Sequence, residues 1–373
     1  MIYLDSAATT FRKPPAVRAA MLRAMQTLSS PGRGGYPSAQ AADRLLFHCR
    51  SLASELFGVT SPERVVFTAS ATHGLNIAIK SLVPPGGRAI ISGWEHNAVT
   101  RPLHALGAET VVAASPLFDA GACVEAFAAA IRDGADAVIC TAASNVFGFC
   151  PPIGEIASLC RAAGVPLIVD AAQSAGVLPL DMDALGAAFV AMPGHKGLYG
   201  PQGTGLLLCG ARAKPLLEGG TGSESLRQEM PEFLPDRLEP GTHNMPGIAG
   251  LAAGLRFVRD TTAARIARHE RALIRRAREG LQTLNGLTVY AARDEALQTG
   301  VLSFTADGWE SEELASALAA RGVAVRAGYH CAPLAHRSVG TLDAGTVRVS
   351  VSAFERAADI DGFLRALREI LAK

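Results

Sequence analysis

The stretch "PLIVDAAQSAGVLPLDMDALGAAFVAMPGHKG", residues 166–197, decides the fold because it holds two strand-like apolar runs, each followed by a charged side chain. The first run ends at Asp170, and the second precedes Lys196. Runs this apolar are typical of strands that helices cover on both faces of a mainly parallel sheet. Such sheets place ligand residues at the carboxyl ends of their strands. We therefore expect Asp170 and Lys196 to lie in one site.

Five more apolar runs flank this stretch and alternate with helical patterns. They are "VVFT" (65–68), "AIIS" (89–92), "TVVAA" (110–114), "AVICT" (137–141) and "GLLLC" (205–209). Together with "PLIVD" and "AFVAM" in the first stretch, they predict an α/β fold with a mainly parallel seven-stranded sheet. A helix is expected before these runs, over 38–58, with Ser38 as its N-cap.

The remaining segments predict a second domain. Residues 214–247 are dense in glycine, proline and polar side chains and predict a long loop, which in a compact domain is usually functional. Beyond it, strand-like and helical segments alternate, with one strand expected over "VAVRAG" (323–328). This α+β pattern predicts a large domain over 12–247 and a small domain formed by 1–11 and 248–373.

The composition is that of an ordinary globular protein, with 49% hydrophobic and 18% charged residues. A net charge of +1 gives no general attraction to nucleic acid or to an anionic membrane, so neither is an expected partner. The uncharged run over 137–154 holds Asn145, Gly148 and two prolines, which predict a buried strand and a loop rather than a membrane helix. The start "MIYLDSAATT" lacks the basic and long apolar segments of a signal peptide. Seven scattered cysteines without a CxxC pair favour a reducing, cytoplasmic location.

The surroundings of Lys196 allow two interpretations. It is either an exposed loop lysine, which is the commoner case, or an amine whose pKa is lowered by an apolar setting, as an imine-forming lysine requires. The P-loop pattern is absent, so a phosphate clamp of that type is not indicated. Asp170 favours the second interpretation, because a carboxylate can pair with the protonated ring nitrogen of pyridoxal 5′-phosphate (PLP). An Asp after a strand is otherwise often a helix cap.

Several motifs, in order along the chain, resemble one known family. They are "YLDSAATT" (3–10), "PGRGGYPSA" (31–39), "WEHNAV" (94–99), "SNVFG" (144–148), "VDAAQSAGVLPLD" (169–181), "PGHKGLYGPQGTG" (193–205), "EPGTHN" (239–244) and "RAGYHCAPL" (326–334). Together they resemble the class V aminotransferase superfamily, and most closely its PLP-dependent cysteine desulfurases. The resemblance runs from end to end. It implies the type I PLP-dependent transferase fold, with PLP bound by the large domain.

The resemblance implies a role for each residue at the cofactor ring. Lys196 matches the lysine that holds PLP and later moves the proton at the substrate Cα. Asp170 matches the partner of the ring nitrogen, and Gln173 would bond to the phenolic oxygen of the ring. His96 matches the imidazole that stacks on the ring and serves in acid–base steps.

For the phosphate, the resemblance implies a helix start and two further side chains. Backbone N–H groups near Ala71 and Thr72, with the hydroxyl of Thr72, would bind there, and His195 is a further ligand. Thr242 matches a residue that reaches the phosphate from the partner subunit, which implies a homodimer with shared active sites. The family commonly has serine where this chain has Pro193, so one phosphate bond is missing or comes from elsewhere.

The resemblance also implies roles for residues that would contact the substrate. Arg348 matches the arginine that binds the substrate α-carboxylate, and Asn145 would orient the same end. Cys331 matches the nucleophile that takes sulfur from the substrate as a persulfide, with Arg326 nearby as a cation that favours the thiolate. A metal site in "HCAPLAH" (330–336) is an alternative, but it lacks a fourth ligand at the usual spacing, and we expect no metal.

The resulting hypothesis is a PLP-dependent cysteine desulfurase that converts L-cysteine to L-alanine and passes the sulfur through Cys331 to an acceptor protein. The short segment between Cys331 and Arg348 resembles the group II (Suf-type) desulfurases and the selenocysteine lyases. A lyase that releases selenide from L-selenocysteine is therefore the close alternative. Another class V activity would leave Cys331 without a role. A non-catalytic scaffold stays open because of Pro193 and an unusual His73 in the phosphate turn.

Overall fold

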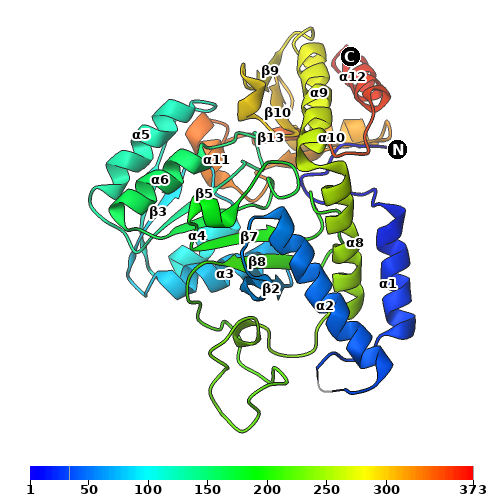
Figure 1. The fold of residues 1–373 in the computed structure, drawn as a ribbon. Coiled ribbons are helices and arrows are strands. Elements are labelled where there is room, and N and C mark those ends of the chain that lie inside the picture. The colour runs from blue at the N-terminus through cyan, green and yellow to red at the C-terminus, as the bar shows by residue number, and fades with distance from the viewer. Residues whose placement is uncertain (33, 373) are drawn as a thin grey trace.

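A computed structural model describes residues 1–32 and 34–372, so the motif "PGRGGYPSA" lies outside the described residues at Arg33. Strands and helices alternate through most of the chain (Figure 1). The helices are α1 (Pro15–Thr27), α2 (Pro37–Leu56), α3 (Ala71–Leu82), α4 (Asn97–Ala105), α5 (Ala120–Ile131), α6 (Ile153–Ala163), α7 (Met182–Leu185), α8 (Met245–Thr261), α9 (Ala263–Leu281), α10 (Ser311–Ala319), α11 (Pro333–Val339) and α12 (Ala357–Leu371). The strands are β1 (Ile2–Tyr3), β2 (Val65–Thr68), β3 (Arg88–Ser92), β4 (Glu109–Ala113), β5 (Ala137–Thr141), β6 (Leu167–Asp170), β7 (Phe189–Pro193), β8 (Gly205–Cys209), β9 (Leu287–Tyr290), β10 (Val301–Ala306), β11 (Val323–Ala324), β12 (Arg326–Gly328) and β13 (Thr346–Ser350).

The seven predicted strands form one sheet in the order β2-β8-β7-β6-β5-β3-β4. The pairs from β7 through β6, β5 and β3 to β4 are parallel, whereas β8 runs antiparallel to both of its neighbours. The prediction of a mainly parallel seven-stranded sheet is thus confirmed. In the register, Asp170 at the end of β6 lies opposite Ala191 of β7. Lys196 follows the end of β7, so both residues lie at the carboxyl ends of neighbouring parallel strands.

Helices cover both faces of this sheet, as the apolar runs predict (Figure 1). On one face, α3 and α4 pack against strand residues such as Ile91 and Ile139. On the other face, α2, α5, α6 and α8 pack against residues such as Val138 and Val169. The edge strand β4 departs from the pattern, because most of its residues are exposed.

A second sheet, in the order β12-β13-β10-β9, is antiparallel throughout, and α9, α10 and α12 pack against it. The single strand that we predicted over 323–328 is wrong. The segment forms two short strands, because β11 pairs in parallel with β1 while β12 pairs with β13. This division places the N-terminal segment against the small sheet, where Asp5 bridges to Ser350.

The start of α2 also differs from the prediction. The helix begins at Pro37, with Tyr36 as N-cap, and the hydroxyl of Ser38 instead bonds to Ser29. Proline suits the first helical turn, where no intrahelical partner for its missing N–H is needed.

The division into 12–247 and 1–11 with 248–373 remains a prediction. Helix α8 packs against α1 and α2 and joins the core of the large sheet through Leu251 and Leu255. Helix α9 joins the small-sheet core. This packing favours a boundary near Thr262, between the two helices, over one at residue 248.

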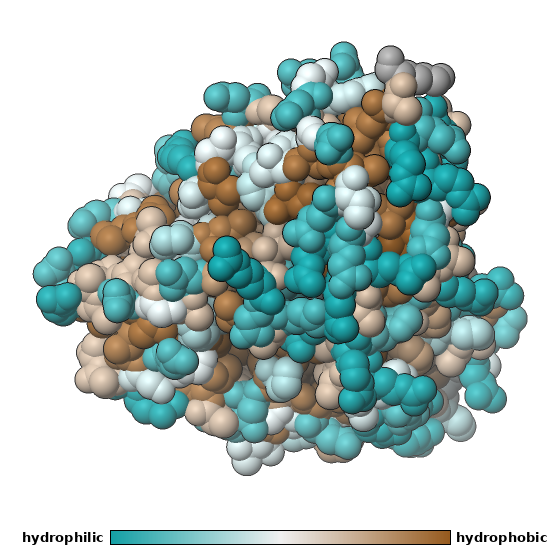
Figure 2. All heavy atoms as spheres, turned by 90° about the horizontal axis from the view of Figure 1, so that it is seen from above, coloured by the Kyte–Doolittle hydropathy of each residue, from teal (hydrophilic) through white to brown (hydrophobic). Residues whose placement is uncertain are grey.

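The small-domain side, seen from above, carries long hydrophilic side chains with apolar ones between them (Figure 2). On α9, Arg275 and Arg276 form ion pairs with Glu295 and Asp361, so these arginines belong to a solvated, internally paired face. Within the described ranges, no helix combines the length and the hydropathy that crossing a bilayer requires.

Candidate active site

A cavity of about 100 Å³ lies at the carboxyl ends of β5, β6 and β7, beside the N-termini of α3 and α4. Most of the residues predicted to bind the cofactor line it. They are Ala71, Thr72, His96, Asp170, Gln173, His195 and Lys196, and Asn145, which was predicted at the substrate end, lines it as well. The convergence follows from the fold, because parallel strands and the helices that follow them meet at this edge of the sheet.

Lys196 and Asp170 enter the cavity from neighbouring strand ends. Desolvation lowers the pKa of Lys196 to about 8, and the charge of Asp170 partly opposes that shift. Asp170 is 3% exposed, and its Oδ1 accepts the N–H of Ala172 at 2.8 Å. Burial raises the pKa of Asp170, while this hydrogen bond and the charge of Lys196 act in the opposite direction. The pair therefore combines an amine that is easily deprotonated with a buried carboxyl group.

His96 is the N-cap of α4, and its Nδ1 accepts the N–H of Ala98 at 2.9 Å. Burial lowers the pKa of His96 to about 4, and the charge of Lys196 adds to the effect. The ring is therefore neutral at pH 7. Because Nδ1 accepts a hydrogen bond, the proton of the neutral ring is assigned to Nε2. The cap thus leaves the ring face and one N–H for a ligand.

His195 is held by the N-terminal segment. Its Nδ1 lies 3.0 Å from the hydroxyl oxygen of Thr9, and Nζ of Lys13 donates to its carbonyl oxygen at 2.8 Å. Burial lowers the pKa of His195 to about 4, and the charges of Lys196 and Lys13 act in the same direction. The neutral ring has one N–H, and it can donate to an anion from Nε2 when the Thr9 hydroxyl donates to Nδ1.

The N-terminus of α3 opens into the same cavity. Ser70 caps the helix by accepting the N–H of His73 at 3.2 Å. The N–H groups of Ala71 and Thr72 precede the first intrahelical bonds, so they are donors for an anion. Pro193 is buried in the lining and offers neither hydroxyl nor N–H. Ser70 also lines the cavity, and its hydroxyl, which accepts the N–H of His73, still has a proton to donate.

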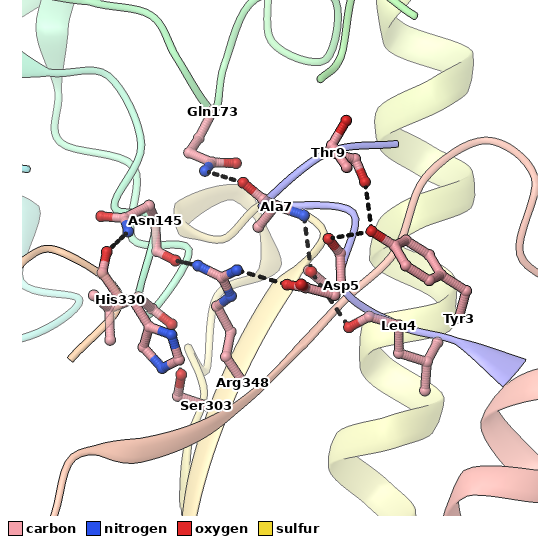
Figure 3. A network of polar contacts seen from close by, with 12 residues as sticks. Tyr3, Leu4, Asp5, Ala7, Thr9, Asn145, Gln173, Ser303, His330 and Arg348 are labelled. Carbon is pink, nitrogen blue, oxygen red and sulfur yellow. Dashed lines mark hydrogen bonds and ion pairs between the residues drawn. The ribbon is translucent and has the colours of Figure 1, made fainter. Parts of the chain in front are cut away.

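Gln173 is tied to the N-terminal segment through its Nε2, which donates to the carbonyl oxygen of Ala7 at 2.9 Å (Figure 3). The N–H of Ala7 in turn donates to the hydroxyl of Ser350 at 2.9 Å. Nε2 carries a second N–H, which remains for an acceptor in the cavity.

Arg348 is 2% exposed and lies in β13 beside the cavity residue Asn145 (Figure 3). Its Nη1 donates to the carbonyl oxygen of Asn145 at 2.8 Å, and its Nη2 donates to Oδ1 of Asp5 at 2.8 Å. Its buried Nε has no protein partner among the described residues. The guanidinium is therefore held in one orientation with donor capacity left for a further anion.

Arg326 lies opposite Arg348 in the register of β12 and β13. Like charges directly opposite each other on paired strands repel, and an anion bound between them relieves that repulsion. The charge of Arg326 also contributes to the lowered pKa of Lys196 and of His96. The small sheet therefore adds positive charge to this side of the site.

Cys331 is exposed, whereas the other six cysteines are buried. It follows His330 in a turn that the N–H of Ala332 closes by donating to the carbonyl oxygen of Tyr329 at 2.9 Å. Both central residues have positive φ, 50° for His330 and 57° for Cys331. The carbonyl oxygen of Cys331 accepts the N–H of Asn97 at 2.8 Å, which ties the cysteine to the start of α4, next to His96.

The histidines around Cys331 do not complete a metal site. The ring centroids of His330 and His336 lie 5.9 Å apart. In the part of the chain that the structure describes, no group of three or more His, Cys, Asp or Glu is arranged to hold a metal ion.

Thr242 lies apart from the other predicted residues. It lines a different cavity of about 220 Å³, together with Glu239 and His243. Buried Glu239 forms an ion pair with Arg50 at 2.6 Å and a hydrogen bond with His243 at 2.7 Å, so both contacts fix the loop that carries Thr242. A role of Thr242 in a partner's site stays a prediction.

The donor set of the cavity fits PLP. A phosphorylated pyridine aldehyde needs a deprotonable amine, a carboxyl group for the ring nitrogen and donors for the phosphate. Lys196, Asp170 and the free N–H groups at the start of α3 supply these groups within one cavity.

Sequence reasoning missed Asp5, Thr9 and Ser70 as site residues. Asp5 and Thr9 lie in the motif "YLDSAATT", where Asp5 is the one charged residue. That charge in an otherwise uncharged segment was a usable signal. Ser70 directly precedes the predicted phosphate-binding turn, and its place as a helix cap could have identified it.

Comparisons with known proteins agree with this geometry. Residues 2–363 match the Aminotransferase class-V family. A probable cysteine desulfurase from Mycolicibacterium paratuberculosis is 32% identical over 99% of this chain, which spans 55% of that relative's length. A probable cysteine desulfurase from Methanothermobacter thermautotrophicus is 30% identical over 99% of this chain and 94% of its own length.

Solved structures show the same fold. The apo structure of a cysteine desulfurase from Thermococcus onnurineus has a TM-score of 0.91 at 28% identity and is matched over 100% of this chain and 94% of its own. A cysteine desulfurase from Escherichia coli has a TM-score of 0.86 at 27% identity, with the same coverage of 100% and 94%. The sheet order, the position of Lys196 and these matches lead to one conclusion: the chain belongs to the class V aminotransferase family.

Proposed function

We propose that this protein is a PLP-dependent cysteine desulfurase, which converts L-cysteine to L-alanine and takes up the sulfur on Cys331 as a persulfide. One observation carries the proposal. The exposed Cys331 is bonded through its carbonyl oxygen to the start of α4, and His96, which caps that helix, lines the cavity of Lys196. The nucleophilic thiol is thus tied to a helix whose N-terminus borders the cavity of the deprotonable amine.

Bound PLP would supply an electron-withdrawing ring that stabilises negative charge at the substrate Cα. Lys196 would hold the cofactor and, once displaced by the substrate amine, take the Cα proton. Its lowered pKa supports this role, because the neutral amine is the form that acts as a base. Asp170 would keep the ring nitrogen protonated, and the neutral ring of His96 would stack on the cofactor.

Arg348 would bind the substrate carboxylate, with Arg326 adding charge beside it. The orientation of the guanidinium by Asp5 and by Asn145 supports this role, because a fixed fork selects a planar carboxylate.

In the sulfur step, the Cys331 thiolate would attack the sulfur of bound cysteine. The new S–S bond forms as the Cβ–S bond breaks, and the electron pair of that bond stays on the carbon side. A proton then replaces the sulfur at Cβ. One cysteine and one enzyme thiol thus give one alanine and one enzyme persulfide, and no external oxidant is needed.

The test is sulfide and alanine production from L-cysteine in the presence of a reducing thiol. Lys196→Ala should abolish both products and the visible PLP absorbance. Cys331→Ala should abolish sulfur transfer but keep the absorbance. A protein that takes up no PLP is not this enzyme.

The same assay with L-selenocysteine addresses the alternative activity. The residues named above could act on either substrate. We propose L-cysteine because the relatives are named cysteine desulfurases. Selenide release that far exceeds sulfide release would replace the desulfurase proposal with a selenocysteine lyase.

We further propose that Cys331 passes its sulfur to an acceptor protein. Cys331 lies directly before α11, which begins at Pro333, so a short ordered segment carries it. Such a segment cannot swing far from the cavity, and we expect slow turnover without an acceptor. Rapid turnover that no acceptor accelerates would contradict this expectation. The free cysteines support a reducing, cytoplasmic compartment.

A homodimer with shared active sites is also proposed. Thr242 lines a cavity other than that of Lys196, which is consistent with its acting in a partner's site. Mixed dimers of Lys196→Ala and Thr242→Ala should regain activity, because one site then holds an intact lysine and the intact threonine of the other subunit. No recovery on mixing would place Thr242 outside the shared site.

A further inference from the structure

The turn that carries Cys331 has an unfavourable backbone conformation. Two consecutive residues with a Cβ, His330 and Cys331, have φ of 50° and 57°. Turns of this kind favour glycine or asparagine at both central positions, and residues with larger side chains are disfavoured there. Strain of this kind at a reactive residue persists only where surrounding contacts hold it.

Asn145 makes one of these contacts. Its side chain follows β5, is 9% exposed, and donates from Nδ2 to the carbonyl oxygen of His330 at 2.7 Å (Figure 3). The N–H of Asn97 holds the next carbonyl, that of Cys331, at 2.8 Å. The two carbonyl groups of the strained turn are therefore both held by the large domain.

Asn145 also contacts the guanidinium of the small sheet. Its backbone carbonyl oxygen accepts from Nη1 of Arg348 at 2.8 Å (Figure 3). A single residue thus bonds to the arginine through its main chain and to the cysteine turn through its side chain. Loss of the side-chain amide leaves the bond to Arg348 possible and removes the bond to the turn.

We propose that Asn145 is a positioning residue whose side-chain amide holds the Cys331 turn in its left-handed conformation, and so fixes the Cys331 sulfur relative to Arg348. The proposal rests on the proposed function, in which Arg348 anchors the substrate and Cys331 takes its sulfur. It is separate from a carboxylate-binding role for Asn145, because one N–H of Nδ2 donates to the carbonyl oxygen of His330 and the second N–H remains for the substrate. A misplacement of a reacting atom by about 1 Å can lower a rate by about 100-fold.

The test compares Asn145→Ala and the isosteric Asn145→Asp with the wild-type holoenzyme. Hydrogen exchange is measured at the N–H groups of Ala332 and Asn97. The first closes the turn by donating to Tyr329, and the second donates to the carbonyl oxygen of Cys331. Loss of one hydrogen bond should speed both exchanges by about tenfold. In Asn145→Ala, kcat for L-cysteine should fall 10- to 100-fold, KM should stay within about threefold, and the PLP absorbance should not change.

A matched control and a rescue separate this role from general damage. Asn76→Ala removes a similar bond, from Nδ2 of Asn76 to the carbonyl oxygen of Thr72, and should leave both exchanges unchanged. His330→Gly is made alone and together with Asn145→Ala, because it relieves the positive φ but also removes the bonds from Nε2 of His330 to Thr346. Relative to His330→Gly alone, Asn145→Ala should speed the exchange less than it does in the wild type, which is the partial rescue expected of a positioning role.

The outcomes are distinct. A rise in KM with unchanged exchange, or a fall in kcat with unchanged exchange, overturns the proposal. Wild-type behaviour of Asn145→Asp overturns it as well, and this variant serves if Asn145→Ala does not fold. The exchange measurement needs no turnover. If the wild type makes no alanine, the desulfurase proposal fails while the exchange data still decide the role of Asn145.

Discussion

Arg348 and Asp5, 343 residues apart in sequence, form an ion pair with 2.8 Å between Nη2 and Oδ1. The arginine side chain is 2% exposed and the aspartate side chain 19%. A guanidinium this deeply buried requires a compensating charge. The N-terminal segment therefore supplies the negative charge that stabilises the buried Arg348 in the small sheet, beside the active site.

This pair predicts strong energetic coupling. In a double-mutant cycle with Asp5→Asn and Arg348→Met, the effects on the free energy of unfolding should differ from additivity by about 1–3 kcal/mol. Asp5→Asn alone should destabilise the protein more than the double variant does, because it leaves a buried charge unpaired. Urea denaturation at pH 7 measures all four proteins. Additive effects would mean that solvent or another group compensates Arg348.

The exposure of the cysteines predicts a simple labelling pattern. A thiol reagent should modify one cysteine per native chain, Cys331, and all seven in urea. Burial raises the pKa of the other thiols, for example of Cys49 and Cys209 to about 12, which suppresses their reactive thiolate. Cys331→Ala should show no rapid labelling. Any fast-reacting thiol in that variant would contradict the burial of the remaining six.

The buried carboxyl group of Glu95 predicts a pH effect on stability. Its Oε1 accepts the N–H of Thr141 at 2.7 Å, while its buried Oε2 lacks a partner among the described residues. Burial raises its pKa from 4.5 to about 8. Between these values the folded protein keeps a proton that the unfolded chain has lost, so the wild type loses stability as the pH rises.

The comparison uses Glu95→Gln, which cannot ionise. The stability of this variant relative to the wild type should increase from pH 5 to pH 8 by up to about 1.4 kcal/mol per pH unit and level off above pH 8. Chemical denaturation at several pH values gives the difference. Parallel curves for the two proteins would show that Glu95 is ionised in the fold.

The lowered pKa of Lys196 predicts how the cofactor-free protein captures PLP. Covalent capture needs the neutral amine, so its rate should rise with pH, with a midpoint near pH 8, and level off above it. Asp170→Asn removes a charge that raises this pKa, and its midpoint should lie at lower pH. Borohydride trapping followed by mass spectrometry measures the rate, with Lys196→Ala as the blank. A midpoint near 10 would indicate a solvated lysine.

The large sheet could be predicted from sequence because its inner strands are runs of buried residues separated by helices. "AVICT" corresponds to β5 and "GLLLC" to β8, residue for residue. The division of 323–328 into two strands could not be predicted, because it depends on pairing between β11 and the N-terminal β1, some 320 residues away. Local periodicity carries no information about such a partner.

The site, too, has one part that the sequence could predict and one part that it could not. The convergence of Lys196 and Asp170 follows from the rule that parallel strands end at one edge, so the sequence could predict it. The bonds from Asn145 to His330 and from Arg348 to Asp5 join residues 185 and 343 positions apart. They arise from the docking of separate chain segments and leave no local pattern.

Pro193 and Ser70 give the final prediction, on how the PLP phosphate is held. Pro193 provides no donor, whereas Ser70, which carries a hydroxyl, lines the same cavity at the start of α3. If Ser70 replaces the missing bond, Ser70→Ala should weaken PLP binding about five- to tenfold, the effect of one lost hydrogen bond. Pro193→Ser should strengthen binding and compensate for Ser70→Ala in the double variant. Titration of the cofactor-free proteins with PLP, followed by absorbance, gives the dissociation constants. If Ser70→Ala binds PLP as tightly as the wild type, the phosphate is held without Ser70, and the free N–H groups of Ala71 and Thr72 carry a larger share of its binding.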